Sequence, residues 1–142
     1  MKLLLLFLPF LITFNCVAQT DNKDIAEIAK TVSYYMDGGT FADSVQFSKA
    51  FSPIGQMLYM RNDTLRVLSL KDFMAGVKNT GLKTDRTTKI DNIQVFGNAA
   101  QAKLTIEYPT FYFHDMMSLL KTKDGWKIVS KIFYREDKPV KK

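Results

Sequence analysis

The sequence is poor in the residues that build covalent and metal centres. Its 142 residues include one cysteine, Cys16, and one histidine, His114. Zinc sites usually take three or four side-chain ligands, most of them Cys or His, so this sequence falls short of one. It also has no Gly-x-Ser-x-Gly nucleophile elbow and no glycine-rich phosphate loop. We therefore expect neither a metal nor a cofactor, and no serine-hydrolase or P-loop chemistry.

The N-terminal segment predicts export. Lys2 precedes an almost unbroken apolar run over residues 3–12, and small residues follow at Cys16 and Ala18. This is the three-part layout of a secretory signal, with cleavage expected after Ala18 to leave Gln19 as the first residue. Removal of residues 1–18 also removes the cysteine, which excludes disulfides and thiolate chemistry from the exported protein.

Two alternatives to cleavage after Ala18 stay open. The apolar run could be a retained anchor, although it is shorter than the roughly 20 residues that a membrane-spanning helix needs. Cys16 could instead become the lipidated first residue of a lipoprotein, but Phe14 and Asn15 stand where such processing prefers small residues. We expect a periplasmic or secreted protein.

The net charge of +6 falls to +5 when Lys2 leaves with the signal. The basic residues are spread along the chain, apart from a short tail that contains Lys138, Lys141 and Lys142. Nucleic-acid binding favours a concentrated basic stripe with exposed aromatic side chains. We therefore expect a solvated surface and no nucleic-acid partner.

Helical periodicity dominates the first third of the exported chain. Apolar residues recur at helical spacing over residues 24–36, and Gly38-Gly39 is expected to stop this helix. Asp43 is placed to cap a second helix that reaches Phe51 and ends before Pro53.

Strand patterns follow. Residues 56–60 and 65–68 predict a β-hairpin with its turn at Asn62-Asp63, and a third helix over residues 70–78 is capped by Ser69. Four further runs, 87–96, 99–108, 111–122 and 126–135, predict an antiparallel meander. The order is that of an α+β domain with helices on one face of a curved antiparallel sheet. The expected organisation is a signal over 1–18, a flexible leader over 19–23, one domain over 24–136 and a basic tail over 137–142.

This element order and several short motifs resemble the nuclear transport factor 2-like superfamily, and within it the branch labelled "putative lumazine-binding". The matching residues are Tyr35-Met36-Asp37-Gly38-Gly39, Asp43-Ser44, Ala50-Phe51, Asn92, Val95, Gly97, Ala102-Lys103, Asp115, Leu119-Leu120-Lys121, Asp124-Gly125-Trp126-Lys127-Ile128-Val129, Lys131 and Phe133. Two positions depart from the family pattern: Ser52-Pro53 replaces a frequent His-Pro pair, and Met116 replaces a frequent aromatic residue.

The resemblance implies a cone-shaped α+β roll, in which a bent sheet wraps the first helix and leaves a deep, mostly apolar cavity. Relatives use this cavity for isomerases, dehydratases, cyclases and simple ligand binding, and many are homodimers packed through their sheets. The habits of the family favour the periplasm of a Gram-negative bacterium. Lumazine itself is not carried over as a ligand, because fold identifies function poorly.

Asp115 is the first candidate for a site. Strand alternation places it on one face with Phe111, Phe113, Met117 and Leu119, so an acid lies within an apolar row. If this face lines the cavity, desolvation favours the protonated acid and suits it to proton transfer near neutral pH. The alternatives are an ion pair with a Lys or Arg at a strand edge, or a bulge that turns the side chain outward.

Two tyrosines are further candidates. Tyr35 lies on the apolar stripe of the first helix, where its hydroxyl could bind a ligand oxygen or stabilise negative charge beside Asp115. Tyr59, on the predicted hairpin, is the other candidate for ligand binding. A tyrosine that closes the core and binds a backbone carbonyl is the competing interpretation. With Phe113 and Met117, these residues make up the predicted ligand site.

The other aromatic and histidine positions have plainer interpretations. His114 is expected on the outer face of the sheet, because neighbouring strand residues point to opposite faces and Asp115 therefore cannot orient it. Trp126 and Phe133 are expected in the core or in a dimer interface.

Three hypotheses for function follow. The first is an exported domain that binds a small molecule in the cavity. The second is an isomerase or dehydratase that uses Asp115 as acid or base with Tyr35. The third is an interaction module whose cavity is filled by Phe113, Met117 and Trp126. A homodimer packed through the sheet is also expected.

Overall fold

The computed structural model describes residues 22–139. The predicted signal over 1–18 and most of the predicted leader therefore lie outside the described residues. The first helix begins at Asn22, so the last two residues of the predicted leader are helical. None of the helices within residues 22–139 has the length and hydropathy needed to traverse a lipid bilayer.

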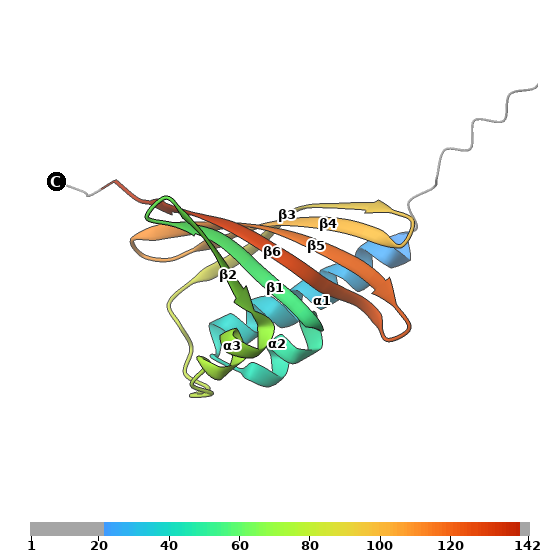
Figure 1. The fold of residues 1–142 in the computed structure, drawn as a ribbon, viewed down its shortest axis with the longest axis horizontal. Helices are drawn as coiled ribbons and strands as arrows, with labels where there is room; N and C mark the ends of the chain where they lie inside the picture. The colour runs from blue at the N-terminus through green and yellow to red at the C-terminus, as the bar shows by residue number, and fades with distance from the viewer. Residues whose placement is uncertain (1–21, 140–142) are drawn as a thin grey trace, which may run out of the picture.

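Three helices and six strands make up the domain. In chain order they are α1 (Asn22–Thr40), α2 (Ser44–Ala50), β1 (Phe51–Arg61), β2 (Thr64–Ser69), α3 (Leu70–Ala75), β3 (Thr87–Phe96), β4 (Ala99–Glu107), β5 (Phe111–Thr122) and β6 (Gly125–Asp137). The strands form one sheet in the order β2-β1-β6-β5-β4-β3. Figure 1 shows α1 crossing behind the sheet, with α2 and α3 gathered at one end of it. The predicted α+β architecture is confirmed.

The meander and the hairpin are confirmed, but one pair of neighbouring strands is not antiparallel. β3 to β6 pair in sequence as antiparallel strands, whereas β1 runs parallel to β6. This pairing sets Phe51 beside Ile128, and both side chains are buried against the helices. Because β1 and β6 are neighbours, the hairpin and the meander share one apolar face and one core. Local sequence patterns could not indicate this pairing, since the two strands are far apart in the chain.

The predicted end of the first helix at Gly38-Gly39 is wrong. α1 continues through both glycines to Thr40, and the left-handed residue that follows is Ala42, with φ of 49°. The glycines serve close packing instead. A Cβ on Gly38 would lie 2.9 Å from Cγ of Phe47, and a Cβ on Gly39 would overlap the guanidinium of Arg86.

The predicted caps of the two short helices are confirmed. Asp43 accepts hydrogen bonds from the backbone N–H groups of Val45 and Gln46, at 2.8 and 3.2 Å. Ser69 accepts one from the N–H of Asp72 at 3.1 Å. The third helix is shorter than expected because its C-cap is Gly76, and α2 leads directly into β1 at Phe51.

The core lies between α1 and the inner face of the sheet. Ile28 and Val32 of α1 are fully buried and belong to the same cluster as Trp126. Thr31 donates to the carbonyl of Trp126 at 3.0 Å, and the indole N–H of Trp126 donates to Asp24 at 3.0 Å. These contacts fix α1 against β6, and the expected core position of Trp126 is confirmed.

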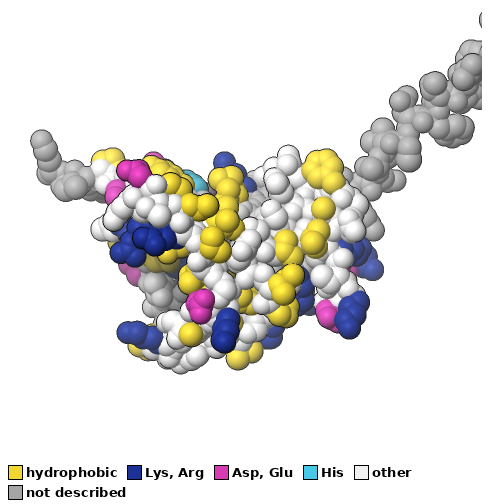
Figure 2. Space-filling view, viewed as in Figure 1, with side chains coloured by type: hydrophobic (Ala, Val, Ile, Leu, Met, Phe, Trp, Pro, Cys, Tyr) yellow, Lys and Arg dark blue, Asp and Glu magenta, His cyan; other side chains and the backbone are white. Residues whose placement is uncertain are grey.

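The outer face of the sheet carries several large apolar side chains that are exposed to solvent. Figure 2 looks onto this face and shows hydrophobic side chains across it, with charged side chains mainly towards the margins. The exposed apolar residues of the meander strands are Phe96, Met116, Leu120, Ile132 and Tyr134.

Candidate ligand-binding site

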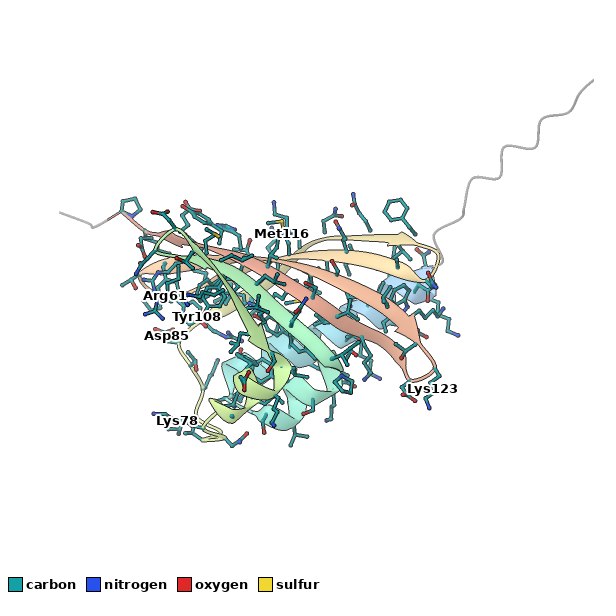
Figure 3. The ribbon with its side chains drawn as sticks, in the orientation of Figure 1. Arg61, Lys78, Asp85, Tyr108, Met116 and Lys123 are labelled. Atoms are coloured by element: carbon teal, nitrogen blue, oxygen red, sulfur yellow. The ribbon has the colours of Figure 1, made fainter. Side chains whose placement is uncertain are left out.

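A cavity of about 640 Å³ opens between the inner face of the sheet and the ends of the three helices. Its volume falls within the range of roughly 300 to 1,000 Å³ that is typical of small-molecule sites. Figure 3 shows Tyr108 and Lys78, two of the lining residues, at the end of the molecule that carries α3 and the loop after it. The helices thus leave one end of the sheet uncovered, and the cavity forms there.

Aromatic rings build one wall of the cavity. Tyr108 meets Phe113 edge to face at 5.9 Å between ring centroids, and Phe113 meets Phe133 in the same way at 5.3 Å. Phe133 then stacks on Tyr59 at 5.1 Å. Phe113, Phe133 and Tyr59 come from β5, β6 and β1, and Tyr108 directly follows β4. Because the four rings contact one another in sequence, they form a continuous apolar surface. We call Tyr108, Phe113, Phe133 and Tyr59 the aromatic wall.

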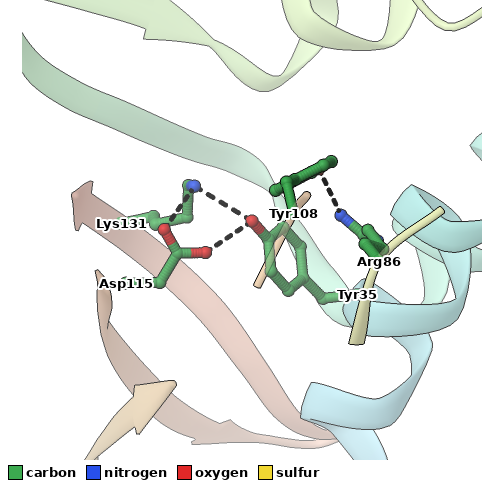
Figure 4. A network of polar contacts seen from close by, with 5 residues as sticks. All are labelled: Tyr35, Arg86, Tyr108, Asp115 and Lys131. Atoms are coloured by element: carbon green, nitrogen blue, oxygen red, sulfur yellow. Dashed lines mark hydrogen bonds and ion pairs between the residues drawn. The ribbon is translucent and has the colours of Figure 1, made fainter. Parts of the chain in front are cut away.

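Three polar side chains meet beside this wall (Figure 4). The Tyr35 hydroxyl donates to Oδ2 of Asp115 at 2.6 Å. Nζ of Lys131 donates to Oδ1 of Asp115 at 3.0 Å and to the Tyr35 oxygen at 2.9 Å. Each member of the group therefore bonds the other two. We call Tyr35, Asp115 and Lys131 the polar triad.

Burial decides the electrostatics of the polar triad. Asp115 is 0% exposed and Lys131 is 6% exposed. Burial lowers the pKa of Lys131, and the facing carboxylate of Asp115 opposes that change. Burial, and next the charge of Asp115, raise the pKa of Tyr35 well above its ordinary value. Tyr35 is therefore a neutral hydroxyl at physiological pH. It lies next to the ion pair of Asp115 with Lys131, which has no net charge.

Arg86, from the loop before β3, also lines the cavity. It donates to three neutral oxygens: Nε to Oγ1 of Thr40 at 3.1 Å, Nη1 to the Tyr108 hydroxyl at 3.0 Å, and Nη2 to the carbonyl of Met36 at 2.5 Å. The contact with Tyr108 is visible in Figure 4. Within residues 22–139, no carboxylate lies within ion-pair distance of Arg86.

The structure brings most of the predicted site residues to the cavity. Tyr35, Tyr59 and Phe113 line it, while Asp115 and Met117 do not. Asp115 lies on the inner face as expected, but behind Tyr35 and Lys131, and Met117 is enclosed in the core. The direct ligand contact expected of these two residues is therefore not available in this geometry. The pairing of Asp115 with a lysine was one of the alternatives, although here the pair is central and not at a strand edge.

Lys131 was missed because of a β-bulge. Ser118 pairs with Ser130 but Leu119 pairs with Ile128, so β6 has one extra residue, Val129. Simple alternation from the buried Ile128 would place the side chain of residue 131 on the outer face of the sheet. The bulge reverses the alternation, so that Lys131 faces the core and Ile132 is 45% exposed.

Other departures concern Phe133, Arg86 and Tyr108. Phe133 lines the cavity and is not simply a core residue. Arg86 lies just before β3, where no periodic pattern assigns it a face. Tyr108 ended the predicted strand over 99–108 but was not among the predicted site residues, and it lies one position beyond β4. His114 contacts Glu136 at 2.8 Å and has no bond to Asp115, as expected. Within residues 22–139, no three His, Cys, Asp or Glu side chains are grouped to hold a metal ion.

The helices laid on a curved six-stranded sheet, with a cavity at one end, define a nuclear transport factor 2-like domain. The chain belongs to the family described as "putative lumazine-binding", whose model matches residues 23–134. No protein with a curated description matches the sequence.

Solved structures agree with this assignment. A nuclear transport factor 2-like protein of unknown function from Shewanella baltica is 27% identical with a TM-score of 0.74, and the match covers 82% of this chain and 97% of that one. A similar protein from Methylobacillus flagellatus is 26% identical with a TM-score of 0.73, covering 83% and 96%. A ketosteroid isomerase-like protein from Erwinia carotovora atroseptica shares the fold, with 14% identity, a TM-score of 0.64, and coverage of 80% and 97%.

Proposed function

We propose that this protein is an exported nuclear transport factor 2-like domain that binds a small molecule in its cavity. The observation that carries the proposal is an open cavity of about 640 Å³ in which an apolar aromatic wall faces a few convergent polar groups. Binding sites for small molecules combine these two properties. The family description agrees with a small-molecule ligand.

The open cavity also argues against a filled interaction module. That hypothesis expected Phe113, Met117 and Trp126 to close the space. Phe113 lies on the wall, while Met117 and Trp126 are buried in the core and leave the cavity open.

A matched pair of substitutions in β2 tests ligand binding. Leu68 lines the cavity, whereas its neighbour Val67 is 60% exposed. We expect Leu68→Trp to fill the space and abolish binding of 1-anilinonaphthalene-8-sulfonate, measured by fluorescence titration. Val67→Trp adds the same ring outside the cavity and is expected to bind like the wild type. Equal binding by both variants would contradict the proposal, and native mass spectrometry of protein from its own host would identify the natural ligand.

An isomerase or dehydratase in the same cavity is the second candidate, favoured by the 2.6 Å contact between Tyr35 and Asp115. Because Tyr35 lines the cavity and Asp115 does not, Asp115 can act only through Tyr35 or Lys131. The Tyr35 oxygen would take a proton from the substrate as its own proton passes to Asp115. Exchange of solvent deuterium into 2-tetralone, followed by NMR, tests this relay. The wild type should accelerate exchange and Tyr35→Phe should not; the absence of acceleration by the wild type would count against it.

We also propose a homodimer formed through the outer face of the sheet. Met116 and Ile132 pair with each other on the two central strands, β5 and β6, and are 47% and 45% exposed. Exposed apolar patches on a sheet commonly mark an interface. Export is proposed on the basis of residues 1–18, with Gln19 as the first residue of the released chain.

A further inference from the structure

The charged groups of the cavity are all of one sign. Its lining residues include the cations Lys78, Arg86 and Lys131 and no aspartate or glutamate. Lys131 is neutralised from behind by Asp115, at 3.0 Å. Arg86 has only neutral partners, so the cavity keeps a positive charge next to an apolar wall.

Two N–H groups of Arg86 are not used by the protein. A guanidinium has five N–H donors, and three of them bind Thr40, Tyr108 and Met36. One N–H on each Nη nitrogen therefore has no acceptor within residues 22–139. A pair of N–H groups on one planar cation matches the two oxygens of a carboxylate.

The position of Arg86 is fixed before any ligand binds. Thr40 and Met36 hold it at the C-terminal end of α1, and the missing side chain of Gly39 makes room for it. Its Nη1 also bonds Tyr108, the first ring of the aromatic wall. A group that is already ordered loses little entropy on binding. The cation is thus held at one end of an apolar surface.

We infer that the ligand is an organic anion with a flat apolar body, such as an aromatic carboxylate. Its anionic group binds the free N–H groups of Arg86, and its body lies against the aromatic wall. Tyr35 and Lys131 also line the cavity and can bind a second polar atom of the ligand. This inference rests on the proposed small-molecule function and adds the chemical class of the ligand.

A purely structural role for Arg86 makes a different prediction. If the guanidinium serves only to bind the last carbonyl groups of α1, its loss would lower stability without changing which ligands bind. The two roles are separated by the selectivity between charged and neutral ligands, and not by stability.

Three probes that share one ring system test the inference: 2-naphthoate, 2-naphthamide and 2-naphthylmethylammonium. We expect the wild type to bind 2-naphthoate at least about tenfold more tightly than the amide, as expected for a charge-assisted hydrogen-bonded pair. The ammonium should bind most weakly, and the preference for the anion should shrink at high salt. Isothermal titration calorimetry measures all three affinities.

Arg86→Gln should bring the ratio of naphthoate to naphthamide affinity close to one while the amide affinity changes little. Lys103→Gln removes the same charge from the exposed side of β4 and should leave the ratio unchanged. If Arg86→Gln does not fold, the Nε–H resonance of Arg86 in the wild type decides, since naphthoate should shift it more than naphthamide does.

The outcomes separate this inference from the proposed function. Equal binding of the anion and the amide in the wild type, or an unchanged ratio in Arg86→Gln, would overturn the inference. In that case, loss of amide binding in Leu68→Trp would still support a ligand-binding cavity. Failure of all three probes to bind would count against both proposals.

Discussion

The guanidinium of Arg86 occupies space that only a glycine at position 39 leaves open beside α1. The three atoms nearest to the missing Cβ all belong to the flexible end of the arginine side chain. The arginine can therefore swing away, at the loss of its bonds to Thr40 and Met36. Two glycines in one helix thus have different physical consequences, because Gly38 lies against the ring of Phe47.

Gly39→Ala is expected to change ligand selectivity without a large change in stability. The helix gains about 1 kcal/mol from replacement of glycine by alanine, which offsets much of the hydrogen bonding lost by Arg86. The preference for 2-naphthoate should disappear, as measured by calorimetry. Gly38→Ala should instead destabilise the fold by about 1 to 3 kcal/mol through overpacking against Phe47. Unchanged selectivity in Gly39→Ala would show that Arg86 does not contact the ligand.

The ion pair of the polar triad predicts strong coupling between two substitutions. Asp115→Asn leaves the buried ammonium of Lys131 without a counter-charge, which costs about 3 to 5 kcal/mol. Lys131→Met likewise leaves the buried carboxylate of Asp115 without a counter-charge, at a similar cost. The double variant removes both charges and should recover part of the lost stability. Urea denaturation of the four proteins gives the coupling energy, and simple additivity of the two losses would contradict this prediction.

Tyr35 predicts a loss of stability at alkaline pH. Burial, followed by the charge of Asp115, raises the pKa of Tyr35 well above its ordinary value of 10.0. Above pH 10 the unfolded chain releases this proton while the folded protein retains it, so stability that is present below pH 10 is lost as the pH rises. The free energy of unfolding should therefore fall more steeply above pH 10 for the wild type than for Tyr35→Phe.

Lys131 acts in the opposite direction. Burial lowers its pKa from 10.5, so its deprotonation in the folded state raises stability as the pH approaches that value. Because Lys131 is present in both proteins, the difference between the two pH profiles reports chiefly on Tyr35. Parallel profiles would mean that Tyr35 ionises in the folded protein as it does in the unfolded chain.

The outer face of the sheet predicts a dimer that one charge can disrupt. Met116→Lys places an ammonium within the exposed apolar patch, where it would be desolvated in an interface. We expect the variant to be monomeric by light scattering at a concentration at which the wild type is dimeric. Val45→Lys changes a side chain that is 62% exposed on α2, and should leave the mass unchanged. A monomeric wild type would refute the dimer.

The proposed export predicts the N-terminal residue of the protein in its host. Protein recovered from its own host should begin at Gln19 by intact mass and N-terminal sequencing. An acylated chain that begins at Cys16 would establish the lipoprotein alternative, and a full-length chain in the membrane fraction would establish the retained anchor.

Local sequence signals predicted the elements well, because each rests on neighbouring residues. The capping groups Asp43 and Ser69 and the alternation around Asp115 are readable over a few positions, and the structure has them as expected. The interior position of Asp115 follows from the same alternation. The ion-pair partner of Asp115, Lys131, did not follow from alternation, because one extra residue in β6 reverses the faces of every position after it.

Arg86 could not be predicted for a different reason. It follows α3 in a segment without regular periodicity, and its three partners lie 22 to 50 positions away in the sequence. The glycine that accommodates it carries a strong local signal for the end of a helix, and that signal is misleading here. Contacts of this kind follow from packing in three dimensions.

The central position of β6 makes it the link between the two halves of the sheet. This strand pairs with both β1 and β5, and so joins the N-terminal hairpin to the meander. It also supplies Lys131 and Phe133 to the cavity. Without β6, no pairing among the described strands joins β2-β1 to β5-β4-β3. Long-range pairing of this kind is intrinsically slow, and the cavity cannot be complete before β6 has paired on both sides.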